Sequence, residues 1–119
     1  MRFVEPESLE EAAAILAEDP EARCLAGGAT LVAMMNAELV EPSQLVSLRR
    51  IEELAGIRPL DGGGTEIGAM TRHATVAAHG GFIGQQRILS AAAQRIGHPA
   101  IRKMGTIGGS ICHADASND

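Results

Sequence analysis

Two pairs of adjacent glycines, far apart in the chain, are the residues whose type and spacing most clearly suggest chemistry. Gly27 and Gly28 lie between a short apolar segment and an apolar helical segment, and Gly108 and Gly109 lie near the other end. Because glycine lacks a Cβ, backbone N–H groups at such turns can approach a ligand closely. A helix that begins there also points the positive end of its dipole at an anion. Two such loops in 119 residues predict a diphosphate-containing, nucleotide-type ligand lying between them.

Neither loop matches a common nucleotide-binding pattern. No Gly-x-Gly-x-x-Gly follows the first apolar strand and no Gly-x-x-x-x-Gly-Lys-Ser/Thr occurs, so a nicotinamide Rossmann site and a P-loop NTPase are disfavoured. Taken alone, Gly27-Gly28 is equally consistent with a tight turn from strand to helix. The second loop favours ligand binding because donors and acceptors follow it, namely Ser110, Cys112, His113, Asp115 and Asp119.

The polar residues after the second loop suggest other kinds of site. Cys112 and His113 could ligate a metal, but the second Cys or His pair of a closed zinc site is missing. Ser110 and His113 could form a nucleophile–base pair, although their placement supplies no orienting carboxylate. Asp115 and Asp119 could act as paired carboxylates. From these residues we name no catalytic residue and predict no metal site.

Composition narrows the function classes further. The net charge is −5, 45% of residues are hydrophobic, and Trp and Tyr are absent. The core must be aliphatic, and the lack of a Lys/Arg cluster argues against nucleic acid as a partner. The N-terminus has no secretory pattern and no apolar run is long enough to span a bilayer. Cys24 and Cys112 could pair, but two free thiols in the cytoplasm are favoured. We expect His73, His79 and His98 to be structural or solvated.

Local signals place the elements that would position the first loop. Ser8 with Glu11 forms a capping box, apolar residues recur at helical spacing from Leu9 to Leu16, and Asp19-Pro20 ends that helix. The order β-α-β-α-β then predicts a small parallel sheet. The remaining elements expected here are strands at 3–4, 23–26 and 44–48, a helix at 31–39 capped by Thr30, and a helical turn at 51–54.

The second half has a different character. Residues 61–64 carry a hairpin signal between strands expected at 56–60 and 65–69. Helices are expected at 72–79, capped by Thr71, and at 87–96, which His98-Pro99 ends. The tail is expected to run through the second glycine loop without a closing strand or helix, which indicates an incomplete domain. The fold class is therefore α+β, with a parallel α/β subdomain at residues 1–55 and the beginning of an antiparallel α+β subdomain at 56–119.

Four segments, in this order along the chain, resemble one known family. They are Phe3-x-x-Pro6-x-Ser8-Leu9-Glu10-Glu11-Ala12, Ala26-Gly27-Gly28-x-Thr30-Leu31, Ile67-Gly68-Ala69-Met70-Thr71 and Ile101-Arg102-Lys103-Met104-Gly105-Thr106-Ile107-Gly108-Gly109-Ser110. Together they resemble the FAD-binding medium subunit of molybdenum hydroxylases, the group of xanthine dehydrogenase, carbon monoxide dehydrogenase and aldehyde oxidoreductase. The resemblance implies a PCMH-type FAD fold, in which the cofactor lies extended between a small N-terminal α/β subdomain and a larger antiparallel one.

The resemblance also implies which residues hold FAD. Backbone amides from Ala26 to Thr30, with the Thr30 hydroxyl, would bind the pyrophosphate, and residues 106–110 would form the opposing wall. Asp119 falls where the family places a carboxylate that bonds the FAD sugar chain, and Ile96 falls near an adenine-packing position. The complete predicted set is Leu25, Ala26, Gly27, Gly28, Ala29, Thr30, Leu31, Ile96, Thr106, Ile107, Gly108, Gly109, Ser110 and Asp119.

The chain departs from the family pattern in three respects. Ser110 stands where the family often has Asn, and Asp115-Ala116 stands where Asp-Pro is common. The second departure gives the backbone before Asp119 more freedom. Family members are also more than twice as long as this chain.

By resemblance the chain is an FAD-binding electron-transfer module. Electrons would reach the flavin from iron–sulfur clusters of a small subunit, which are reduced by a molybdenum cofactor in a large subunit, and would leave to an external acceptor. The redox chemistry would belong to the flavin. The alternative from another class is a truncated, non-catalytic module that docks on partner subunits without holding FAD. A metalloenzyme using Cys112 and His113 is a third hypothesis.

Overall fold

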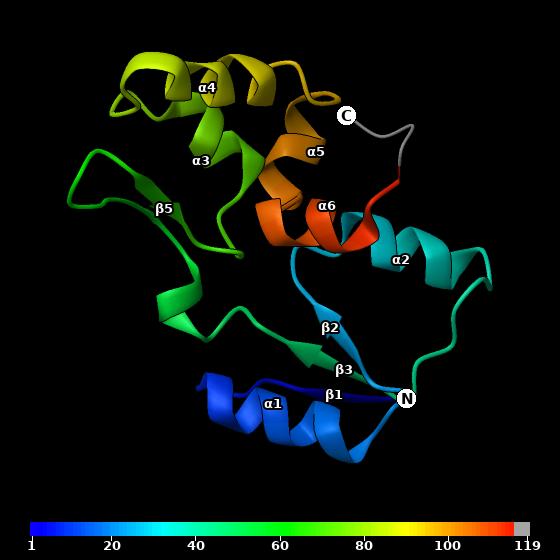
Figure 1. Cartoon of the computed structure of the whole chain (residues 1–119). Helices are drawn as coiled ribbons and strands as arrows, with labels where there is room; N and C mark the ends of the chain where they lie inside the picture. Colours follow the sequence, from blue (N-terminus) through cyan, green and yellow to red (C-terminus); the bar gives the residue numbers. More distant parts are fainter. Residues whose placement is uncertain (116–119) are drawn as a thin grey trace.

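The first half of the chain forms a three-stranded parallel sheet. The structure is a computed structural model that describes residues 1–115 (Figure 1). The strands are β1 (Arg2–Val4), β2 (Arg23–Leu25) and β3 (Gln44–Ser47), in the spatial order β1-β3-β2. Phe3 and Arg23 both lie opposite Leu45, and all four residues of β3 are buried. The predicted parallel sheet is thus present, and β3, the last of its three strands in the sequence, lies at its centre.

Helix α1 (Leu9–Glu18) covers one face of this sheet (Figure 1). Its Ser8 cap is as predicted, since the Ser8 Oγ accepts a hydrogen bond from the Glu11 N–H at 3.1 Å. The Glu11 carboxylate reaches back one residue further than a capping box requires and accepts from the Glu7 N–H at 3.1 Å. The apolar face of α1 buries Ala12 in a cluster with Ala22, Val46 and Ile51, the first of two cores.

The second half of the chain builds its own small core. The predicted hairpin is present as β4 (Ile57–Pro59) and β5 (Thr65–Ile67), which pair antiparallel. Helices α3 (His73–Ala78) and α4 (Arg87–Ala93) pack together and bury Val76, Phe82 and Ala93. Short 3₁₀ turns η1 (Glu52–Leu54) and η2 (Gly84–Gln86) lead into the hairpin and into α4.

Several predicted helix boundaries are wrong. Helix α2 spans Ala29–Asn36, with Gly28 at φ 85° as its N-cap in place of Thr30. It stops before the predicted end at Leu39 because Glu38 takes a left-handed conformation, φ 58°. Helix α4 likewise ends at Ala93. Thr71 does not cap α3. Its buried hydroxyl instead accepts from the Gly56 N–H at 3.0 Å and donates to the Gly56 carbonyl at 3.1 Å.

Two helices at the C-terminal end were not predicted. Pro99 ends no helix but opens α5 (Pro99–Met104), because a proline in the first helical turn has no N–H to leave unbonded. Helix α6 (Ile107–His113) follows, capped by the Thr106 Oγ1, which accepts from the Gly109 N–H at 3.1 Å. The second glycine pair therefore lies in the first turn of a helix and not in a loop, and the expectation of a tail without a closing helix is wrong.

The arrangement confirms an α+β fold class. The Cα radius of gyration is 15.3 Å, whereas a compact single-core domain of this length has about 13–14 Å. The difference fits two small hydrophobic clusters in place of one core. None of the helices in residues 1–115 has the length and apolar character that a bilayer crossing requires.

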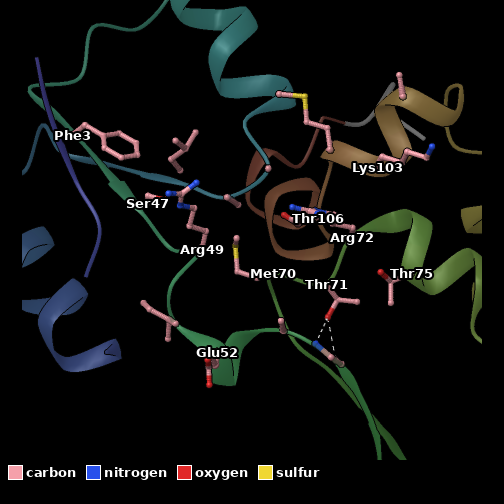
Figure 2. Close-up of a pocket in the computed structure, with 18 residues that line it drawn as sticks. Phe3, Ser47, Arg49, Glu52, Met70, Thr71, Arg72, Thr75, Lys103 and Thr106 are labelled. Atoms are coloured by element: carbon pink, nitrogen blue, oxygen red, sulfur yellow. Dashed lines mark hydrogen bonds between the residues drawn. The ribbon is translucent and has the colours of Figure 1, made fainter. Parts of the chain in front are cut away.

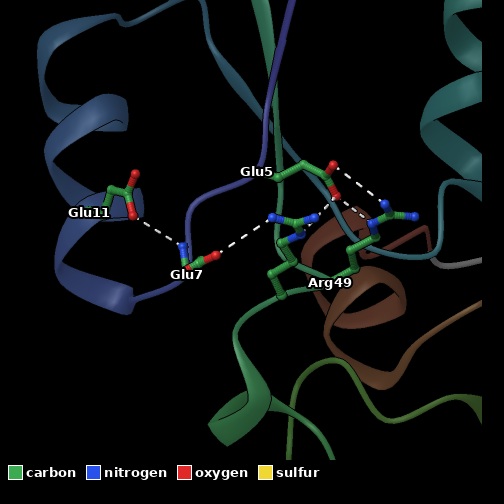
Figure 3. A network of polar contacts seen from close by, with 5 residues as sticks. Glu5, Glu7, Glu11 and Arg49 are labelled. Atoms are coloured by element: carbon green, nitrogen blue, oxygen red, sulfur yellow. Dashed lines mark hydrogen bonds and ion pairs between the residues drawn. The ribbon is translucent and has the colours of Figure 1, made fainter.

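Ion pairs join the chain after β1 to the chain after β3 (Figure 3). The Glu5 carboxylate accepts from the Arg49 guanidinium and is 4.0 Å from the Arg50 Nε. The Arg50 Nη1 also lies 3.5 Å from the Glu7 Oε1. Both segments follow parallel strands, so these pairs stand at the carboxyl edge of the sheet. Since the arginines are more than half exposed, each pair contributes little stability, about 0–1 kcal/mol.

Asp19 provides a prediction for stability at low pH. Its Oδ2 accepts hydrogen bonds from the Ser43 hydroxyl at 2.5 Å and the Gln44 amide at 2.8 Å. These two bonds hold the pKa of Asp19 below its usual value of 3.8. The stability they supply is therefore present above that value and is lost as the pH falls through the lower pKa of the folded chain.

We expect Asp19→Asn to flatten the acid limb of a plot of unfolding free energy against pH, measured by urea denaturation. Asp61→Asn, in the exposed hairpin turn, serves as the matched control and should leave that limb unchanged. Equal acid limbs in the wild type and Asp19→Asn would contradict the assigned role of Asp19.

Candidate functional site

The two glycine segments lie against each other in the folded chain. A Cβ on Gly27 would lie 1.8 Å from the Met104 carbonyl oxygen and 3.2 Å from the Gly105 Cα. A Cβ on Gly109 would lie 4.0 Å from the Ala26 Cβ. The beginnings of α2 and α6 are correspondingly neighbours in Figure 1. Residues about eighty positions apart thus lie side by side, which is the arrangement that the two-loop hypothesis requires.

The beginning of α2 presents a run of unbonded backbone donors. Among residues 1–115, no group accepts a hydrogen bond from the N–H of any residue from 27 to 31, and the Val32 N–H is the first to bond, to the Gly28 carbonyl at 2.9 Å. The cap residue Gly28 has no side chain to satisfy them, and no acidic residue lies in the first turn. These five residues are half-buried. Orphan N–H groups of this kind, together with the helix dipole, attract an anion.

The beginning of α6 differs, because its donors are already used. The Ile107 N–H donates to the Thr71 carbonyl at 3.0 Å, and the Gly108 N–H donates to the Ala69 carbonyl at 2.8 Å. The Gly109 N–H bonds the Thr106 hydroxyl. The expectation of bare amides at both bends is therefore wrong for α6. What α6 offers to the site is a surface without a side chain at Gly109, held firmly by its bonds to the chain at 69–71.

The glycines of the site have separate reasons to be glycine. Gly27 allows the close approach of the Met104 carbonyl. Gly28 has a positive φ, which residues other than glycine rarely adopt. A Cβ on Gly108 would lie 2.8 Å from the Ala69 Cβ. Gly109 is under the weakest internal constraint, since a Cβ there would meet only the Thr106 Oγ1 at 3.0 Å and the Ala26 Cβ. Gly109 is consequently the position whose lack of a side chain packing explains least.

The other residues predicted for the site are distributed over its surroundings. Leu25 and Thr106 line a hollow next to the glycine segments. Ile96 and Ile107 pack on the second core instead of facing the α2 donors, and the role of Ile96 against an adenine stays a prediction. Asp119 lies outside the residues that the structure describes.

A hollow of about 820 Å³ adjoins the glycine segments (Figure 2). Phe3 and Ser47 reach it from the face of the parallel sheet opposite α1, and Arg49, Arg72 and Lys103 also line it. Figure 2 shows Met70, Thr71 and Thr75 across the hollow from the sheet strands. Sequence reasoning identified part of this lining, namely Leu25, Ala26, Gly27 and Thr106, but not the hollow itself, because only the fold brings its five separate segments together.

His73 is a polar residue next to the site, for which the sequence predicted only a structural or solvated role. It is buried, only 4% exposed, and its Nε2 lies 3.0 Å from the Ser110 Oγ. Burial lowers the pKa of its imidazole. The expectation that it is structural is consistent with this position. A histidine followed by apolar residues at helical spacing would have been a usable signal for a buried ring.

The residues considered for metal or thiol chemistry are dispersed. Within residues 1–115, no group of three or more His, Cys, Asp or Glu side chains is placed to hold a metal ion. The His113 Nε2 lies 3.8 Å from the Asp115 Oδ2 near the end of α6. Cys24 and Cys112 are both exposed, and they are free cysteines that form no disulfide with each other. Ser110 lies 3.0 Å from the His73 Nε2, but among residues 1–115 no carboxylate bonds the other ring nitrogen, so the described part of the chain holds no nucleophile–base–carboxylate set around Ser110 or His113.

Comparison with known proteins identifies the family. The family described as the FAD-binding domain in molybdopterin dehydrogenase matches residues 1–119. The chain belongs to this family. The family resemblance drawn from the sequence is thereby confirmed, and FAD is the cofactor of these domains. A diphosphate ester fits the run of free α2 donors, which is the observation of this structure that accords with FAD.

Individual relatives agree in sequence and in fold. The chain is 43% identical over 116 residues to the 6-hydroxypseudooxynicotine dehydrogenase complex subunit alpha of Paenarthrobacter nicotinovorans, covering 97% of the chain and 39% of that protein. It is 38% identical to the carbon monoxide dehydrogenase medium chain of Hydrogenophaga pseudoflava, covering 96% of the chain and 40% of that protein. The crystal structure of quinoline 2-oxidoreductase from Pseudomonas putida 86 superposes with a TM-score of 0.94 at 37% identity, covering 100% of the chain and 41% of that one.

The chain matches only part of the length of each of these relatives. The chain spans about two-fifths of the length of the proteins it matches. The superposition extends over the whole chain, so the α+β arrangement, including the unpredicted α5 and α6, is the fold of the family. Several relatives are named as subunits or medium chains, so they work within multi-subunit complexes.

Proposed function

We propose that this FAD-binding domain holds the FAD diphosphate between the beginning of α2 and the first turn of α6. The observation that carries the proposal is the run of five unbonded N–H groups at residues 27–31, facing a helix turn without a side chain at Gly109. Hydrogen bonds from backbone N–H groups to an ionised phosphate are each worth about 1.5–3 kcal/mol. The Thr30 hydroxyl stands in the same turn and supplies one further donor.

The protein's part in the reaction is to bind and orient. The α2 donors fix the diphosphate. Gly109 of α6 and the N-cap residue Thr106 form the opposite wall of the site. When bound, FAD supplies the redox chemistry, accepting electron pairs and releasing them. Within residues 1–115 we assign no acid, base or nucleophile. The proposed FAD-binding set is the one predicted from the sequence, with the backbone of residues 27–31 as its main donor group.

We further propose that the complete protein transfers electrons from iron–sulfur clusters of a small subunit, through FAD, to an external acceptor. The clusters would be reduced by a large molybdopterin-binding subunit. The medium-chain names of the relatives support this assignment. We place the boundary between two FAD-binding subdomains at residues 55–56, which the separate clusters around Val46 and Val76 support. A cytoplasmic location accords with two free, exposed thiols.

A second candidate function is a subunit-docking module that holds no FAD by itself. It concerns the matched segment taken alone, which spans about two-fifths of the length of its relatives. A cofactor site that lacks its remaining walls loses burial of the ring system, and affinity falls steeply with lost contact.

Equilibrium dialysis against FAD separates the two candidates. The chain is tested beside a chimera in which residues 1–119 replace the matching segment of the carbon monoxide dehydrogenase medium chain of Hydrogenophaga pseudoflava. Our proposal predicts micromolar or tighter binding by the chimera, with flavin absorption bands in the dialysed protein. Binding by the chimera but not by the chain would mean that the site needs its remaining walls. Absence of binding in both would favour the docking module.

A further inference from the structure

His73 contacts both the turn that precedes α6 and α6 itself. Its backbone N–H donates to the Gly105 carbonyl at 3.0 Å, and its side-chain Nε2 lies 3.0 Å from the Ser110 Oγ. The ring edge also packs against Gly105, where a Cβ would lie 2.9 Å from the His73 Cδ2. The residue is 4% exposed. One side chain from the beginning of α3 thus contacts both the turn before α6 and the helix itself.

The polar contacts of His73 decide which nitrogen carries the proton of the neutral ring. The Nδ1 is buried, and no group among residues 1–115 bonds to it. A buried N–H without an acceptor is rarer in proteins than a buried acceptor without a donor. The proton therefore belongs on Nε2, which donates to the Ser110 Oγ. In this tautomer the Ser110 hydroxyl keeps its own proton free to donate elsewhere.

The bond to Ser110 fixes a part of α6 that the backbone bonds leave free. The Ile107 and Gly108 N–H groups attach only the first turn of α6 to the chain at 69–71. Ser110 is one residue beyond Gly109, so a side-chain bond there limits the rotation of the helix about its axis. That rotation sets how closely Gly109 lies to Ala26 at the edge of the proposed diphosphate site.

We infer that His73 is a positioning residue for the flavin site, whose neutral ring holds Ser110 and so keeps Gly109 beside Ala26, at the edge of the proposed diphosphate site. The inference rests on the proposed function, because the position of Gly109 matters only if the diphosphate lies there. It assigns His73 no contact with FAD. The inference also requires that a charged His73 ring does not hold Ser110 in this position.

A charged His73 ring would carry a second N–H at Nδ1, where the described part of the chain offers no acceptor. Burial is the sole cause that lowers the pKa of His73, so no neighbouring charge compensates. In residues 1–115, none of the ionisable side chains on the surrounding elements bonds to the ring; they are Arg72, His79, Arg87, Arg102, Lys103, Cys112 and His113.

The consequence is a pH dependence with a defined sign. In a displaced state, in which the His73 ring leaves its buried position for solvent, burial no longer holds its pKa below the ordinary value of 6.5. As the pH falls below that value, protonation favours the displaced state, and the apparent FAD affinity falls with the population of the competent state. Above that pH both states hold a neutral ring, and His73 makes no contribution to the pH dependence.

The test is FAD binding between pH 7.5 and 5.5 by the chain or chimera that binds it, comparing His73→Gln, Ser110→Ala and the double variant. Each single variant should lower the affinity for FAD about tenfold at pH 7.5. The double variant should lose no more affinity than the single variant that binds FAD less tightly. The wild type should lose affinity toward pH 5.5, whereas His73→Gln should not. His79→Gln, whose ring packs on Phe82, is the matched control and should keep the wild-type pH profile.

The outcomes separate the inference from the proposed function. Additive losses in the double variant, or a wild-type pH profile in His73→Gln, would overturn the role of His73 while FAD binding itself stands. Absence of FAD binding by the wild-type chain and chimera would refute the proposed function and the inference together. If His73→Gln does not fold, ¹⁵N shifts of the wild-type ring decide: a protonated Nε2 supports the inference, and a protonated Nδ1 contradicts it.

Discussion

Gly27→Ala should lower the free energy of unfolding by about 2 kcal/mol, the middle of the range for forcing an extra methyl into a packed site. The added Cβ would lie 1.8 Å from the Met104 carbonyl oxygen, so either the turn before α2 or the end of α5 must move. Both neighbours are backbone and cannot turn aside as a flexible side chain would. For a domain of this size the loss corresponds to about 8 °C in Tm.

Thermal unfolding followed by circular dichroism measures the effect of Gly27→Ala. Gly80→Ala is the matched control, because a Cβ on Gly80 meets no atom within 4 Å and its φ is not positive. The control should unfold within about 2 °C of the wild type. A Tm for Gly27→Ala equal to that of the control would show that the two glycine segments do not pack as described.

Gly109→Val should abolish FAD binding and leave the fold intact. The branched side chain would project from α6 beside Ala26, toward the α2 donors that are proposed to hold the diphosphate. Losing two charge-assisted hydrogen bonds costs about 3 kcal/mol or more, which corresponds to a loss of affinity of at least about a hundredfold. The contact with the Thr106 Oγ1 at 3.0 Å is tight but involves a side-chain atom, so we expect α6 to persist.

FAD titration and far-UV circular dichroism of the same sample test this variant, with Gly80→Val as its control. Wild-type affinity in Gly109→Val would refute the placement of the diphosphate against α6. Gly28→Val is a poorer choice, although the sequence suggested it equally. Gly28 has φ 85°, and a Cβ there would meet Leu25 and Val32 side chains, so backbone strain would weaken the fold whatever the ligand.

The first half of the fold was predictable because its signals are local. Ser8 with Glu11 marks the beginning of α1, and the short apolar runs at β2 and β3 mark strands on either side of a helical pattern. Strand pairing then follows from the β-α-β-α-β order. The glycines at 62–64 similarly predicted the β4–β5 hairpin. In each case the residues that specify the element lie inside or next to it.

Helix α5 was missed because Pro99 is the first residue of a helix and not, as predicted, the end of one, and α6 was missed because distant contacts hold it. Helix α6 has seven residues, two of them glycines that disfavour helix by about 1 kcal/mol each. It persists because the Gly108 N–H bonds the Ala69 carbonyl and because His73 bonds Ser110. Those partners lie nearly forty residues earlier in the chain. A propensity argument has no access to them.

The candidate site was foreseen in part for the same reason. Glycine pairs at strand–helix junctions indicated where backbone could approach a ligand, and the family match confirms that the ligand is FAD. Which amides remain free is decided by tertiary hydrogen bonds, so the sequence could not distinguish the available donors of α2 from the used donors of α6. The contact of His73 with Ser110 was not predicted, because it depends on packing between α3 and the chain before α6.

The central claim is that the free N–H groups at the beginning of α2 receive the diphosphate of FAD. Amide chemical shifts in ¹H–¹⁵N spectra of the FAD-binding form, recorded with FAD and with riboflavin, which has no diphosphate, test it directly. We predict that FAD produces large shifts at residues 27–31 and at Gly109, and that riboflavin leaves those amides in place. Shifts confined to the hollow around Phe3 and Ser47, or equal shifts with both ligands, would contradict the account.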